Sequence, residues 1–130
     1  QLIERLPETI EDEKFGLVRV RDRFQFVMNE YNRVQSLISL TKKPDWGQIS
    51  ALFDSSWEDT RDLLGTHTAE MERVATETRD KKGVLGVKVL GAGFGGSLLV
   101  CTKQDVDLGL DAIEHRPGKG FKLRSLQKND

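Results

Sequence analysis

The stretch from Val84 to Thr102 constrains this chain most, because a cluster of glycines divides the most apolar run of an otherwise polar sequence. Residues 91–96 read Gly-Ala-Gly-Phe-Gly-Gly and fit the G-x-G-x-x-G pattern, which alone is a weak signal. A dinucleotide-binding loop would require a helix directly after the glycines. Residues 97–102 are instead a short apolar run without helical spacing, which predicts a second strand. We therefore expect a hairpin of strand, glycine loop and strand.

Two interpretations of this glycine loop follow from its residues. Glycine allows positive φ angles and close approach of the backbone, so that successive N–H groups can point at one anion. This favours a phosphate-binding loop formed by Gly91, Ala92, Gly93, Phe94, Gly95, Gly96 and Ser97. A flexible or bulged hairpin loop without any ligand accounts for the same spacing.

Length and composition favour one modest domain over residues 1–130, with 1–14 as a poorly defined lead-in that we expect to be a frayed helix. The net charge of −1 argues against partners such as nucleic acid or an anionic membrane surface. No apolar stretch reaches the ~18 residues that a membrane span needs. We therefore expect a cytoplasmic protein. Its single cysteine, Cys101, is expected to be an inert core residue.

The remaining pattern predicts an α+β fold in which helices come first. Apolar residues at helical spacing predict helices over about 21–40, 45–64 and 68–83, followed by the glycine hairpin, a short helix near 106–113 and a strand near 121–126.

Local signals refine this prediction. Asp45 and Thr68 are expected to cap the second and third helices at their N-termini. Gly65 and Gly83 are expected to end the same two helices. The tryptophans Trp46 and Trp57 are expected to be core and staple residues. The histidines His67 and His115 are expected on the surface, since they lack metal-ligand spacing.

Residues 86–97, Gly-Val-Lys-Val-Leu-Gly-Ala-Gly-Phe-Gly-Gly-Ser, resemble the third signature motif of the GHMP kinases, the superfamily of galactokinase, homoserine kinase and mevalonate kinase. Residues 23–34 and 61–72 resemble further motifs of the galactokinase branch, so the similarity covers about 19–126. Leu90 and Ser97 stand where the family often has Thr and Cys, and Phe26 replaces its usual His.

The resemblance implies a ferredoxin-like C-terminal domain of an ATP- and Mg²⁺-dependent kinase that phosphorylates a sugar hydroxyl. It assigns no catalytic residue to this chain, because the catalytic aspartate and the Ser-rich phosphate loop of such enzymes have no counterpart here. Lys88 either adds positive charge beside the loop or faces solvent. Leu17-Val18-Arg19-Val20 is the only strand-like segment upstream of the helices.

The implied partners are therefore an N-terminal kinase domain, or the remainder of the same enzyme, and a sugar substrate. A sheet that lacks its first strand would expose an edge through which copies could associate. The alternative is a stand-alone, non-catalytic module of the same fold that contacts ATP or docks a partner.

Overall fold

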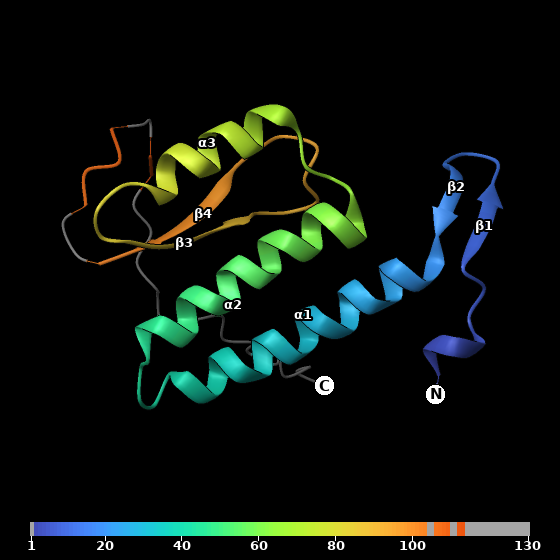
Figure 1. The fold of residues 1–130 in the computed structure, drawn as a ribbon, viewed down its shortest axis with the longest axis horizontal. Helices are drawn as coiled ribbons and strands as arrows, with labels where there is room; N and C mark the ends of the chain where they lie inside the picture. Colours follow the sequence, from blue (N-terminus) through green and yellow to red (C-terminus); the bar gives the residue numbers. More distant parts are fainter. Residues whose placement is uncertain (1, 104–105, 110–111, 114–130) are drawn as a thin grey trace, which may run out of the picture.

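The computed structural model describes residues 2–103, 106–109 and 112–113. Three helices, α1 (Val20–Leu40), α2 (Trp46–Asp59) and α3 (Ala69–Arg79), lie between two antiparallel hairpins in the chain order. The first hairpin is β1 (Thr9–Asp12) with β2 (Gly16–Arg19), and the second is β3 (Val84–Val89) with β4 (Leu98–Thr102). Two short helical turns, η1 (Ile3–Arg5) and the π-helical η2 (Thr60–Leu64), complete the described elements. The predicted α+β class is confirmed (Figure 1).

The lead-in is not the frayed helix that the sequence predicted. After the turn η1, residues 9–19 form the β1–β2 hairpin at the N-terminal end of α1, away from β3 and β4 (Figure 1). Two signals in its tight loop explain the hairpin. The Asp12 carboxylate accepts hydrogen bonds from the amides of Lys14 and Phe15, both at 2.9 Å, and Gly16 takes a φ of +68°. Strand β2 includes three of the four residues of the strand-like segment 17–20 that the sequence indicated.

The predicted helix caps are correct except at one end. Asp45 accepts the Gln48 amide at 3.0 Å, and Thr68 accepts the Met71 amide at 3.2 Å. Gly65 ends η2 with a φ of +69°. Gly83 does not end α3, which stops at Arg79; its φ of +95° belongs to the turn that starts β3.

The hydrophobic core forms where α2 and α3 pack against β3 (Figure 1). It consists of five buried residues: Trp57, Met71, Ala75, Val87 and Val89. Successive residues of a strand point to opposite faces, so Gly86 lies on the other face of β3 from Val87. There it lies so close to α2 that an added Cβ would be 2.9 Å from the Phe53 ring carbon Cγ. Trp57 is thus a core residue, as predicted, whereas Trp46 at the start of α2 is exposed and is not part of the buried core.

Helix α1 is held to the rest of the domain by polar residues. Asn29 and Arg33 donate to the Asp59 carboxylate of α2 at 2.8 and 2.7 Å. Arg33 also donates to Glu30 at 2.7 Å, and Lys88 of β3 reaches the same Glu30 carboxylate at 3.1 Å. This chain of ion pairs joins α1, α2 and β3.

The apolar stripe of α1 is instead largely exposed. Its exposed residues are Val27, Met28, Tyr31, Val34, Leu37 and Ile38. In the described part of the chain, the helix therefore docks through its charged side rather than through the stripe that made it recognisable in the sequence.

The region after β4 departs from the sequence prediction. Residues 106–109 and 112–113 are not helical, and the Asp107 carboxylate accepts the Gly109 amide at 2.8 Å in a local turn. Gly109 takes a φ of +58°, which a regular helix excludes. The strand expected near 121–126 lies outside the described residues. Among the helices of the described part, none has the length and apolar character to cross a membrane.

We expect Asp45→Ala to lower the free energy of unfolding by about 1 kcal/mol, because it removes the N-terminal cap of α2. Asp45→Asn keeps an acceptor for the Gln48 amide and should lie close to wild type. Urea unfolding followed by circular dichroism measures both. Equal losses in the two variants would contradict the capping role.

A second prediction concerns the acid stability that depends on Glu30. Burial by itself raises the pKa of Glu30, but hydrogen bonds from Ser56, Arg33 and Lys88 outweigh it, so the folded pKa lies below the ordinary 4.5. A carboxyl group with a lowered folded pKa stabilises the fold above its unfolded pKa, and this stabilisation is lost as the pH falls through the folded value.

Glu30→Gln should therefore cost about 1.5–3 kcal/mol at pH 7, and its difference from wild type should shrink as the pH falls below 4.5. Unfolding curves at several pH values measure the difference, with the exposed Glu58→Gln on α2 as a control. A difference that stays constant with pH would show that the ion pairs of Glu30 contribute nothing.

Candidate functional site

The predicted phosphate-binding residues all lie in the loop that joins β3 to β4. The Leu90 amide donates to the Ser97 carbonyl at 3.1 Å and closes the loop at its base. Between them, residues 91–96 leave the strand pairing, which resumes at the pair Val89 and Leu98. The structure thus confirms the predicted strand, glycine loop and strand. The glycines are followed by β4 and not by a helix.

Only part of the loop backbone is bonded to the rest of the chain. The Phe94 amide donates to the Thr66 carbonyl at 2.7 Å, and the Gly95 amide points at the Met71 sulfur at 3.3 Å. The other loop amides donate no hydrogen bond to any described residue. They belong to Gly91, Ala92, Gly93, Gly96 and Ser97. The loop is thus anchored at two amides and presents a set of unpaired donors.

The loop conformation depends on its glycines. Gly91, Gly93, Gly95 and Gly96 have φ angles of +87°, +86°, +115° and +82°. Phe94 shares the left-handed conformation with a φ of +59°, which is unusual for a bulky residue, and its ring is 75% exposed. Such an outlier persists where the surrounding contacts impose it. Here the short bond from the Phe94 amide to Thr66 is that contact.

Thr66 contacts the glycine loop at Gly93 and Phe94. It is buried, and a Cβ added to Gly93 would lie 2.6 Å from its Cβ and 2.8 Å from its carbonyl oxygen. Only glycine fits at position 93, whereas an added Cβ at Gly91 meets nothing within 4 Å. Sequence analysis missed Thr66 because nothing in the local pattern separates it from an ordinary turn residue.

The segment that carries Thr66 is itself fixed by arginines of α1. Arg23 donates to the carbonyls of Leu63 and Leu64, and Arg19 donates to the Asp62 carbonyl at 2.7 Å. These carbonyls lie at the end of η2, where helical backbone acceptors lack partners. Arg23 is one of the residues that resembles the galactokinase motif, and its observed role is to position the turn before Thr66.

Lys88 takes neither of the two roles considered for it. Its ammonium group is paired with Glu30 at 3.1 Å, and the side chain is half-buried between β3 and α1. It therefore neither faces solvent freely nor points to the glycine loop. Its partner Glu30 lies in residues 23–34, the segment of α1 that resembles a galactokinase motif.

His67 is not the surface histidine that the sequence predicted. Its side chain is 5% exposed, its Nδ1 atom lies 2.7 Å from the Glu72 carboxylate, and its ring centroid lies 4.1 Å from that of Trp57. The tryptophan ring and the first turn of α3 enclose it. His115 lies outside the described residues.

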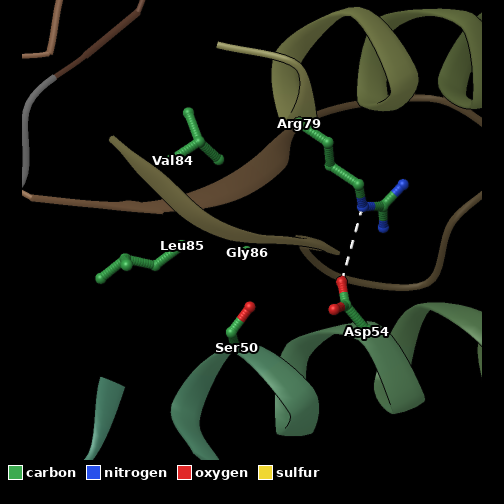
Figure 2. A pocket seen from close by; sticks show the side chains of 6 residues that line it. All are labelled: Ser50, Asp54, Arg79, Val84, Leu85 and Gly86. Carbon is green, nitrogen blue, oxygen red and sulfur yellow. Dashed lines mark ion pairs between the residues drawn. The ribbon is translucent and has the colours of Figure 1, made fainter. Parts of the chain in front are cut away.

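A small cavity of about 170 Å³ lies at the other end of β3 (Figure 2). It is lined by Ser50, Asp54, Arg79, Val84, Leu85 and Gly86. Arg79 faces Asp54 across it at 3.6 Å, and Arg79 also donates to the Val87 carbonyl at 3.2 Å. Ligand pockets for drug-sized molecules usually hold about 300–1,000 Å³. The cavity is lined by the first residues of β3, whereas the glycine loop follows the last residue of that strand, so the two are separate.

The described residues offer little other chemistry. No group of three or more His, Cys, Asp or Glu in this part of the chain is placed to hold a metal ion. Cys101 is half-buried in β4, and burial raises the pKa of its thiol, which fits the predicted inert residue. The unpaired amides of the glycine loop are therefore the feature best suited to bind a ligand.

Comparison with known proteins shows which family the chain belongs to. Residues 37–119 match the family model described as GHMP kinases C terminal. A galactokinase from Thermotoga petrophila is 34% identical over 85 residues, which are 65% of this chain and 24% of that protein. Galactokinases from Clostridium tetani and Streptomyces coelicolor are 30% and 28% identical over 69% and 83% of this chain, and over 23% and 27% of their own lengths.

The chain spans about a quarter of the length of these relatives. The family model covers more than half of the chain, including α2, α3 and the whole glycine hairpin. The chain therefore belongs to the GHMP kinases, in the family formed by their C-terminal domains.

Proposed function

We propose that this chain is the C-terminal, phosphate-loop-supporting part of an ATP-dependent sugar kinase that phosphorylates a sugar hydroxyl. The observation that carries the proposal is the glycine loop, which is anchored at the amides of Phe94 and Gly95 and whose other amides donate no hydrogen bond to any described residue. The relatives named galactokinase supply the class of acceptor. Galactose is therefore the first sugar to test.

The geometry of the loop suits the phosphates of ATP. Unpaired backbone amides stabilise negative charge, and the glycines leave no side chain between the backbone and an anion. Phosphoryl transfer depends mainly on positioning the transferred group and on neutralising its charge. The amides of Gly91, Ala92, Gly93 and Gly96 would hold phosphate oxygens in place.

The loop would perform this function without protein ligands for Mg²⁺. Residues 91–97 contain no carboxylate, and Mg²⁺ in such sites is usually held by phosphates and one or two carboxylates. Bound Mg²⁺ would add positive charge at the phosphates. The loop itself would contribute through its backbone amides.

The rest of the active site is proposed to come from the remainder of the enzyme. The loop is exposed and does not line the cavity at the start of β3, whereas nucleotide sites are concave. The chain also spans only about a quarter of its relatives, so a partner lobe would close the site and supply the catalytic aspartate.

We expect the chain to bind MgATP weakly, with a Kd of about 1 mM or higher, which corresponds to only ~4 kcal/mol of binding free energy. In a titration followed by amide NMR shifts, ATP should move Gly91, Ala92, Gly93 and Gly96, and AMP should move them much less. With galactose present, the chain alone should release no ADP. Equal shifts with AMP and ATP would contradict binding through the outer phosphates.

A matched pair of substitutions tests the loop directly. Gly91 and Gly93 have nearly the same φ, so alanine is strained equally at both, but only at Gly93 does the new Cβ meet Thr66. Gly93→Ala should abolish the ATP-dependent shifts and cost about 1–3 kcal/mol more stability than Gly91→Ala, since overpacking adds to the strain. Calorimetry and the same titration measure this. Similar behaviour of the two variants would refute the supporting contact.

A further inference from the structure

Thr66 and His67, named here the loop seat, contain two buried polar atoms that lack a hydrogen-bond partner among the described residues. These atoms are Thr66 Oγ1 and His67 Nε2. Buried polar atoms without partners are uncommon, and each one needs a physical reason. For His67, the reason that we infer is that Glu72 and Trp57 hold its side chain in one orientation.

His67 is fixed from two sides. Because a carboxylate only accepts hydrogen bonds, the 2.7 Å contact with Glu72 assigns the proton to His67 Nδ1. The Trp57 ring, tilted by 51° to the imidazole, packs against the same side chain from α2. In the neutral ring Nε2 is then a bare lone pair, which costs less to bury than an unpaired N–H of a charged ring.

The position of His67 is coupled to the loop through one peptide group. The carbonyl of Thr66 and the amide nitrogen of His67 belong to the same planar peptide unit. That carbonyl accepts the Phe94 amide at 2.7 Å, the shortest backbone bond to the glycine loop. A rotation of the His67 backbone would therefore turn the acceptor away from Phe94.

We propose that His67, held by Glu72, is a positioning residue that orients the Thr66 carbonyl and thereby fixes the glycine loop in the conformation that presents its unpaired amides. This inference rests on the proposed function for its consequence, which is tighter binding of a triphosphate.

Two amide substitutions separate this role from simple packing. Asn places its side-chain NH₂ near the position of His Nδ1, whereas Gln places it near Nε2, and both remove the aromatic contact with Trp57. His67→Asn should therefore keep the bond to Glu72, and His67→Gln should lose it. Glu72→Ala removes the acceptor and leaves the imidazole in place, so it serves if His67→Gln fails to fold.

The readout is the native-state hydrogen exchange of the Phe94 amide in the 130-residue chain. His67→Gln and Glu72→Ala should speed this exchange about tenfold relative to Asp45→Ala, which weakens the fold away from the loop, because a local hydrogen bond then opens more often. His67→Asn should stay within about threefold of wild type, and so should Thr66→Val, which keeps the carbonyl.

The inference fails if Phe94 exchanges equally in His67→Gln and Asp45→Ala, or equally in His67→Asn and His67→Gln. A parallel titration with MgATP separates it from the proposed function. If wild type shows no loop shifts with MgATP but Phe94 responds as expected, the proposed function fails and the positioning role stands. If wild type binds MgATP and Phe94 exchange is indifferent to His67, the function stands and the positioning role fails.

Discussion

The hydrogen bond from the Phe94 amide to the Thr66 carbonyl is the contact on which the arrangement of the site depends. At 2.7 Å it joins the glycine loop to the turn between η2 and α3. Without it, a loop with four glycines in the left-handed region would sample many conformations, because glycine restricts the backbone least. The bond also explains why a bulky residue such as Phe94 takes a positive φ. Together with the contact between the Gly95 amide and the Met71 sulfur, this bond anchors the middle of the loop.

The segment between η2 and α3, which carries Thr66, is itself held by charged residues that are distant in the sequence. Arg23 fixes the end of η2 through two backbone carbonyls. Arg33 of α1 pairs with Asp59 of α2, and Lys88 of β3 pairs with Glu30 of α1. These groups are half-buried, so their ion pairs are screened less than surface pairs, but each must be complete to be useful. The charged residues that resemble the galactokinase helix motif thus serve as a frame.

The sequence predicted those features that depend on local physics. The caps at Asp45 and Thr68, the inner faces of α2 and α3 and the strand after the glycines follow from spacing and side-chain chemistry within a few residues. The errors arose where contacts are distant or where a turn competes with a helix. His67 is buried because Trp57 and Glu72 enclose it. Thr66 supports the loop only because the chain returns 27 residues later at Gly93, and no local pattern contains that information.

The glycine loop is exposed and is nevertheless held in an unusual backbone conformation. A loop that supported only a hairpin could use two residues in a tight turn, whereas this one keeps four glycines and a strained phenylalanine in place. Local strain of this kind costs about 1–3 kcal/mol per residue and persists only where surrounding contacts impose it. Fixing the amides before a ligand arrives removes part of the entropy cost of binding. The Thr66 contact holds the Phe94 amide, and the arginines hold the turn that carries Thr66. In the proposed function, this anchoring and the buried His67 would keep the unpaired amides of the loop oriented before an anion binds, which is what stabilising charge during phosphoryl transfer requires.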